Sequence, residues 1–491
     1  MLTIQNLFSW LTVAALLYSG VVTALAVEPP HPILSIPGSS NPTLANAIIN
    51  NYTETEYVNN FVPRQSPRNN SYGFVPAVVP GDTGWSWSSS TPNLITSTPS
   101  GTVFPTTPAY PIYYENVLVT SGKTLAMPYY LRAGSSTAKS MVFELINHNK
   151  RNKLRSDLNV LAPTYMASGS THATRNQAYA RRIAVALLDW AAYMPDYVMT
   201  AKNSATYINA GPDYILSSDL QRASDHNGLA HEWADDELFA FDAIYDSPAL
   251  AQLSIEKGFD VRQYITDNLY CNEGDFIVYR VPINVAISSN LSGPYTVLAL
   301  VARVLNRPDY IDYMDRYLDA TVTRKIQRDG TLSEGMGYSI GYINENLDAA
   351  RNTRNYFLTR PADTPELQAI SVRTNTYVNI LEYGRAQWQA ASLPNGQLPS
   401  FGDTPFKTYF AARNSGTSVL LPAYGSVSMG AGSSSGTAVQ LNQCFAGDNN
   451  HMRSDTCAYV LWAFGNEVLG NVRYHNGTPG RQFTEQILAY N

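Results

Sequence analysis

Residues 174–194, which read Thr-Arg-Asn-Gln-Ala-Tyr-Ala-Arg-Arg-Ile-Ala-Val-Ala-Leu-Leu-Asp-Trp-Ala-Ala-Tyr-Met, decide the fold class of this chain. Their apolar side chains recur every three or four positions and form a wide stripe, as expected of an amphipathic helix. The stripe consists of Ala178, Ile183, Ala184, Ala186, Leu187, Trp190 and Ala191. A helix with such a face buries it against other elements of the protein.

The same helical pattern begins at about Thr137 and persists for roughly 260 residues. Further helices are predicted at residues 228–245, 292–305, 308–323, 340–351 and 365–390. Because no strand-rich stretch separates them, the helices are expected to pack on one another. We therefore predict a mainly α fold, in which residues 137–400 form an incomplete α/α toroid that carries the catalytic site.

Two segments precede the predicted toroid. Residues 7–23 are apolar and are followed by Ala24-Leu25-Ala26, the small-x-small pattern of a signal peptidase site. We predict a signal peptide at residues 1–26 and a secreted, extracellular mature protein, with an uncleaved anchor as the alternative. Residues 27–136 are rich in Pro, Ser, Thr and Asn and have little periodicity, so we predict an extended segment that lies over the core.

The composition of the sequence changes again near residue 400. Residues 428–436 are rich in Gly and Ser, and residues 456–464 and 467–474 are short runs of apolar, aromatic and β-branched residues around Gly465-Asn466. These runs predict a β-hairpin. We interpret residues 401–491 as a linker and the start of an antiparallel β-sandwich domain, a truncated one by its length.

Composition excludes several classes of protein. A chain of 491 residues with 44% apolar residues can build at least one large core. Its net charge of -6 and its lack of a long basic run argue against a nucleic-acid partner or an anionic membrane surface. The spacing of Cys271, Cys444 and Cys457 matches no zinc pattern. We predict no cofactor, and no membrane association after signal cleavage.

Two polar stretches are candidates for chemistry. In Asp329-Gly-Thr-Leu-Ser-Glu-Gly-Met-Gly-Tyr338, glycines flank Glu334 and Tyr338 where a loop enters a helix, and glycine lets a bulky ligand approach the backbone. The alternative is an ordinary turn with a packed tyrosine. The second stretch, Gly447-Asp-Asn-Asn-His451-Met-Arg453-Ser-Asp455, lies directly before a predicted strand.

Together these stretches, in this order, resemble the heparinase II/III-like and alginate lyase group of polysaccharide lyases. That group joins an α/α toroid to a C-terminal antiparallel β-sandwich, and the resemblance covers roughly residue 137 to the end. It implies that Tyr338, in a Glu-Gly-x-x-Tyr context with Glu334, acts from the toroid, and that His451 reaches in from the β domain. It also implies an anionic uronate polysaccharide as partner. We predict Glu334 and Arg453 as substrate-binding residues, although Arg453 departs from the pattern of the group.

The resemblance implies a third catalytic residue, an Asn that binds the uronate carboxylate. Asn290 opens a helix in the expected place, although Leu291 stands where the family often has His. Asn290 also lies in an N-glycosylation sequon, Asn-Leu-Ser, and a simple helix N-cap is the alternative reading. Some members carry a structural zinc, but Arg453 and Asn471 stand at two of its ligand positions here, so we predict no metal.

The reaction implied is β-elimination next to a uronate carboxylate. Two other classes of function stay open. An inverting glycoside hydrolase on an α/α toroid needs two carboxylates, for which Glu232, Asp235, Asp236 and Glu334 are candidates. A non-catalytic glycan-binding remnant is the other alternative, because the resemblance implies more β-sandwich than this chain holds. A short β part is expected to expose strand edges and apolar surface.

Overall fold

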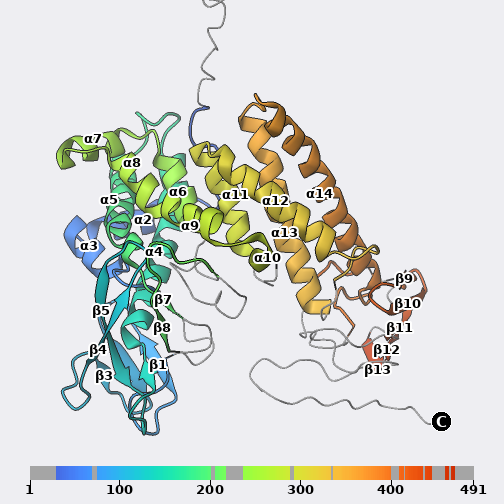
Figure 1. The fold of residues 1–491 in the computed structure, drawn as a ribbon, viewed down its shortest axis with the longest axis horizontal. Coiled ribbons are helices and arrows are strands. Elements are labelled where there is room, and N and C mark those ends of the chain that lie inside the picture. The colour runs from blue at the N-terminus through green and yellow to red at the C-terminus, as the bar shows by residue number, and fades with distance from the viewer. Residues whose placement is uncertain are drawn as a thin grey trace, which may run out of the picture.

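In the computed structural model of the protein, the described residues are 29–68, 75–200, 205–216, 236–287, 292–332, 336–399, 408–413, 415–434, 437–444, 459–463 and 466–469. Helices dominate these ranges, and an antiparallel sheet follows them (Figure 1). The predicted fold class, a mainly α incomplete toroid followed by an antiparallel β part, is confirmed. Among the described helices, none is both long and apolar enough to cross a bilayer.

The helices fall into two groups, which Figure 1 shows side by side. The first group is α2 (Pro42–Asn50), α3 (Glu54–Phe61), α4 (Val142–Ala167), α5 (Gln177–Tyr193), α6 (Asp236–Ile244), α7 (Pro248–Lys257), α8 (Val261–Ile265) and α9 (Asn272–Arg280). The second group is α10 (Ile283–Ala286), α11 (Gly293–Leu305), α12 (Pro308–Arg324), α13 (Met336–Thr359) and α14 (Pro365–Ala391). A π-helical turn, Thr266–Cys271, connects α8 to α9.

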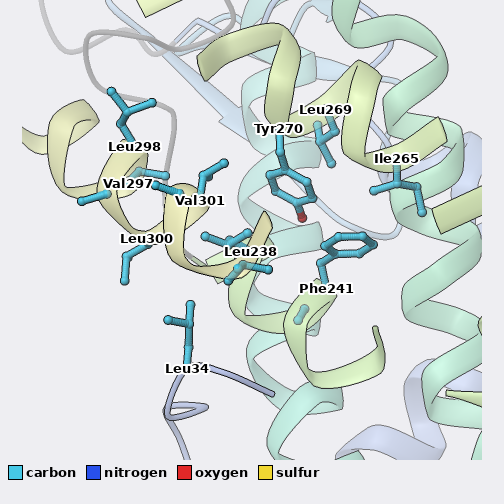
Figure 2. Packing of buried hydrophobic residues seen from close by; sticks show 14 of the residues in the cluster. Leu34, Leu238, Phe241, Ile265, Leu269, Tyr270, Val297, Leu298, Leu300 and Val301 are labelled. Atoms are coloured by element: carbon cyan, nitrogen blue, oxygen red, sulfur yellow. The ribbon is translucent and has the colours of Figure 1, made fainter. Parts of the chain in front are cut away.

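One continuous core joins the two groups of helices. Phe241 of α6 and Tyr270 of the π-helical turn are fully buried, and their ring centroids lie 5.1 Å apart. Figure 2 shows Val297, Leu298 and Val301 of α11 beside this pair, and all belong to the same cluster of buried residues. The toroid is therefore a single packed body.

The segment predicted to be extended, residues 27–136, differs from that prediction. It contains α2, α3 and most of the small strands, and α3 begins with a capping box between Thr53 and Glu56. Tyr57 and Phe61 of α3 are fully buried in the main core. These helices are short and amphipathic, so the polar composition of the whole segment hid them. The domain boundaries themselves stay a prediction.

The small strands of the N-terminal part form three sheets. Their bounds are β1 (Gly84–Trp87), β2 (Ile95–Thr98), β3 (Val103–Phe104), β4 (Tyr113–Leu118), β5 (Thr124–Leu131), β6 (Lys139–Ser140), β7 (Met199–Thr200) and β8 (Tyr207–Ile208). Trp85 and Trp87 belong to β1, where their indole N–H groups donate to backbone carbonyls of Val75 and Pro92. Both side chains therefore help to anchor this part of the chain.

The chain before α2 is attached to the first group of helices by one buried carboxylate. Asp242 of α6 accepts the backbone N–H groups of Ile33 (3.1 Å) and Leu34 (2.7 Å). Its Oδ1 also lies 2.5 Å from Nδ1 of His31, whose ring stacks on Tyr245. The acidic stretch around residue 242 thus has a structural role that sequence reasoning did not assign.

The C-terminal sheet is a meander of five antiparallel strands in the order β13-β12-β11-β10-β9. The strands are β9 (Val419–Leu421), β10 (Ser426–Ala431), β11 (Val439–Cys444), β12 (Tyr459–Ala463) and β13 (Asn466–Leu469). The pairing of β12 with β13 confirms the predicted hairpin.

The two faces of this sheet have different surroundings. Leu421, Val460 and Trp462 are buried against α13 and α14. Leu420, Met429 and Val439 alternate with buried neighbours along their strands, so they occupy the opposite face, and all three are exposed. The expected exposure of apolar surface is therefore present in the described part of the sheet.

Candidate functional site

Tyr338, the tyrosine predicted to be catalytic, lies in the first turn of α13 and is half-buried. Residues four and seven positions further along a helix share its face. Tyr342 and Glu345 therefore lie on the Tyr338 face of α13. Tyr342 belongs to the same buried cluster as Met336 and Ile340, which lie on the other side of the helix. That cluster also contains residues of the C-terminal sheet and of the end of α14.

Glu345 joins α13 to the beginning of α11. Its Oε2 accepts the backbone N–H of Ser292 (2.9 Å) and the Ser292 hydroxyl (2.7 Å). Ser292 is the N-cap residue of α11, but its own side chain does not cap that helix. Glu345 thus supplies a hydrogen-bond acceptor at the start of α11. Its negative charge also interacts favourably with the positive end of the helix dipole.

We expect Glu345→Ala to lower the free energy of unfolding by about 1 kcal/mol, because α11 loses the acceptor at its N-terminus. Glu345→Gln keeps an acceptor oxygen and should lose less. Urea unfolding followed by circular dichroism measures both. Glu382→Ala is the matched control, since Glu382 of α14 forms only an exposed ion pair with Arg351. Equal losses for Glu345→Ala and Glu382→Ala would contradict the assigned role.

The loop before α13 is attached to the C-terminal sheet by Asp329. One carboxylate oxygen of Asp329 accepts the backbone N–H groups of Ala423 (2.8 Å) and Tyr424 (3.2 Å), in the turn between β9 and β10. The other oxygen accepts the backbone N–H and the hydroxyl of Thr331. Asp329 therefore holds the loop that leads to Tyr338 against the β part of the protein.

Gly330 has a different role from the one its sequence context suggested. Its φ is +80°, a left-handed conformation that favours glycine. A Cβ built on Gly330 would lie 2.6 Å from Cα of Gly384 in α14. This glycine permits close packing of the loop on a helix, so a ligand is not needed to explain it.

Four candidate site residues lie outside the described residues: Asn290, Glu334, His451 and Arg453. Within the described ranges, no group of three or more His, Cys, Asp or Glu side chains is arranged to hold a metal ion. Residues 453 and 471 are not part of those ranges, so the absence of a zinc site stays a prediction.

Asp236 of α6 is one of the candidate carboxylates for the alternative function, an inverting glycoside hydrolase. Asp236 is in an ion pair with Arg155. Its neighbour Glu237 is buried, with a carboxylate oxygen 3.8 Å from Arg151 and another 3.6 Å from Arg155. Burial raises the pKa of Glu237, and the two arginines oppose that rise. These contacts fit a structural role; Glu232 and Asp235 lie outside the described residues.

The arrangement of helices and sheet can be compared with solved structures. The crystal structure of heparan sulfate lyase HepC from Pedobacter heparinus matches 69% of this chain and 51% of its own, at 14% identity and a TM-score of 0.41. In fold, the chain is similar to heparinase-type lyases. A heparinase III with methylated lysines matches 69% of this chain and 52% of its own, at 12% identity and a TM-score of 0.35.

The chain spans about half the length of these two lyase structures. The two structures are a heparan sulfate lyase and a heparinase III, members of the group that the sequence is predicted to resemble. No protein-family model matches the sequence, and no curated protein sequence is significantly similar to it. We therefore base the proposed function on the residues of this chain itself.

The motif around Tyr338 predicts this tyrosine as a candidate site residue. The sequence did not predict the contact of Glu345 with Ser292 or the role of Asp329. Glu345 contacts a residue 53 positions away, and no local pattern marks that contact. In the sequence, Asp329 is simply the first residue of the Tyr338 stretch. Its position before a Gly and a Thr is typical of a turn, which gives no information on a bond to residues 423 and 424.

Proposed function

We propose that this protein is a secreted polysaccharide lyase that cleaves a uronate-containing glycan by β-elimination. The observation that carries the proposal is the double hydrogen bond from Ser292 to Glu345, on the Tyr338 face of α13. Asn290 precedes Ser292 by two residues, a separation that spans at most about 7 Å. The bond therefore supports a common site for Asn290 and Tyr338.

Contacts of the β part support the inclusion of His451. Val460 and Trp462 of β12 belong to the same buried cluster as Met336 and Ile340, at the start of α13. His451 precedes the first residue of β12 by eight positions in the sequence. The N-terminal end of α13 is thus the point at which toroid and sheet meet, and we place the proposed reaction there.

The proposed reaction removes the proton on C5 of a uronate and forms a C4=C5 double bond. The electron pair of the C5–H bond enters the new double bond, the bond from C4 to the glycosidic oxygen breaks, and that oxygen takes up a proton. Asn290 would hydrogen-bond the carboxylate and stabilise the charge that develops on it. Tyr338 and His451 would share the two proton transfers.

The tyrosine needs help to act as a base near neutral pH. The pKa of an unperturbed tyrosine is about 10, so a nearby positive charge or hydrogen-bond donor must favour its phenolate. We propose that His451 supplies this help and that Arg453 and Glu334 bind the anionic chain. The proposed partner is accordingly a polysaccharide with regularly spaced carboxylates.

The test is incubation of the secreted protein with alginate, glucuronan, heparan sulfate and polygalacturonate, followed by ultraviolet absorbance of the unsaturated product. We expect absorbance to rise with one or more of these substrates. Release of reducing ends without a rise in absorbance would instead identify a hydrolase. Neither signal from any polymer would favour a non-catalytic glycan-binding protein.

A further inference from the structure

A cavity of about 620 Å³ is lined by residues of α3, α5, α7 and α8. These helices belong to the first group (Figure 1). Cavities of roughly 300–1,000 Å³ are typical of small-molecule sites. Its apolar floor consists of Val58, Val185, Leu188 and Leu253. None of the elements that line it belongs to the region around Tyr338, so the cavity is separate from the proposed elimination site.

Two aromatic rings form one wall of this cavity. Phe259 and Tyr264 both line it, and their ring centroids lie 5.3 Å apart at an angle of 53°. Phe259 is 43% exposed, so part of its ring is accessible to a ligand. The two tilted rings thus offer an apolar surface to a ligand.

The rim carries a rigid set of charged groups centred on Arg181. Its Nη2 donates to Oε2 of Glu54 (3.1 Å) and to Oε2 of Glu256 (2.8 Å), while Nη1 donates to Oε1 of Glu256 (2.8 Å). Its Nε also donates to Glu54. The bonds from Arg181 lower the pKa of Glu256. Each nitrogen of Arg181 is already engaged, so this rim offers a ligand mainly carboxylate acceptors.

The charges around the cavity balance. Asp189, the third carboxylate of the lining, pairs with Arg64 at 3.4 Å, and Lys257 is the second cation of the lining. The lining thus holds three acids and two bases, and Arg64, which lies outside the lining, neutralises the third acid. Neither a strongly anionic nor a strongly cationic ligand is therefore favoured. The suitable ligand is uncharged, donates several hydrogen bonds and has an apolar face.

We propose that this cavity binds a neutral pyranose unit of a glycan. The C–H face of the sugar ring would pack against Phe259 and Tyr264, while its hydroxyl groups donate to Glu54 and Glu256. The site would hold a glycan on the outside of the toroid, and its existence does not depend on the proposed lyase activity. A uronate is disfavoured because its carboxylate would meet the acceptors of the rim.

The test is ligand-observed NMR and calorimetric titration of the full-length protein with cellotriose, maltotriose and mannotriose. Glucose 6-phosphate, a charged sugar without the carboxylate that the proposed elimination site would bind, and choline serve as anionic and cationic comparators. We expect at least one neutral trisaccharide to bind more tightly than both comparators. Phe259→Ala should weaken that binding by about tenfold, because the ring contact is lost. Ala192→Trp, at an exposed lining position of α5, should abolish it by filling the cavity.

Ile255→Ala is the matched control, because Ile255 is 75% exposed on α7 and does not line the cavity. We expect this variant to bind as the unchanged protein does. The proposal is overturned if no neutral trisaccharide binds, or if a comparator binds as tightly. It is equally overturned if Phe259→Ala and Ala192→Trp leave the affinity unchanged, since binding would then take place elsewhere.

Discussion

Tyr338→Phe is expected to lower kcat on the best uronate polymer by about a thousandfold, because the phenol oxygen that transfers a proton is lost. KM should change little, since the ring and its place in the first turn of α13 are kept. The measurement is the initial rate of ultraviolet absorbance over a range of polymer concentrations. The urea midpoint of the variant should equal that of the unchanged protein.

Tyr383→Phe provides a matched control for the loss of a phenol hydroxyl. Tyr383 lies on α14 and is 50% exposed. Its variant should retain full activity on every polymer. If Tyr338→Phe retained full activity as well, Tyr338 would have no role in proton transfer, and the proposed site would be wrong.

Trp388→Ala is expected to give the largest loss of stability, about 3–5 kcal/mol. Trp388 of α14 is fully buried, and its ring meets that of Tyr424 edge-on, with centroids 4.7 Å apart. It belongs to the cluster that also contains Met336 of α13 and Trp462 of β12. Removal of the indole would leave a cavity where the sheet contacts the toroid.

The same substitution should reduce any lyase activity, because the proposed site lies at this junction. Thermal and urea unfolding by circular dichroism measure the loss of stability. Tyr383→Ala, on the exposed side of the same helix, should change the free energy of unfolding by no more than about 0.5 kcal/mol. A Trp388→Ala variant as stable as Tyr383→Ala would show that the buried cluster does not hold the sheet in place.

Polar side chains also hold the sheet against α14. The amide groups of Gln440 and Asn442 donate to the carbonyls of Ser392 and Ala391, each at 2.8 Å. A helix leaves its last carbonyls without partners inside the helix, so these side chains complete the end of α14. Both amides are fully buried, which makes the register of β11 specific.

The sequence predicted several helices closely because their signals are local. The starts of α11, α12 and α14 each carry a proline within the first two positions, at Pro294, Pro308 and Pro365. Proline there is compatible with a helix start, and apolar stripes follow it. For these three helices the structure differs from the predicted bounds by one residue at most.

The long helix α4 lies within the stretch predicted to be helical, but its bounds were not predicted, for a physical reason. It buries charged residues, including Glu144, Arg151 and Asp157, on the side that faces its neighbours. Arg151 lies near buried Glu237 of α6, and its guanidinium also lies 5.9 Å from the centre of the Trp190 ring. A helix whose buried side is partly ionic shows no clean apolar stripe, so periodicity alone does not reveal it.

The candidate site could be predicted only in part. The motif around Tyr338 is continuous in sequence, and its place at the start of a helix was expected. The partners that fix this helix come from distant segments: Ser292 through Glu345, and residues 423 and 424 through Asp329. Such contacts depend on how the toroid closes and how the sheet packs on it, which no local pattern records.

The central claim is that the glycosidic bond is broken by elimination. The most direct test is cleavage of the best uronate polymer in heavy-oxygen water, followed by mass spectrometry of the oligosaccharides. Elimination adds no water, so we predict products that carry no heavy oxygen and lack the elements of one water relative to hydrolysis products. Products that contain one heavy oxygen for each bond broken, at the new reducing end, would contradict the account and identify a hydrolase.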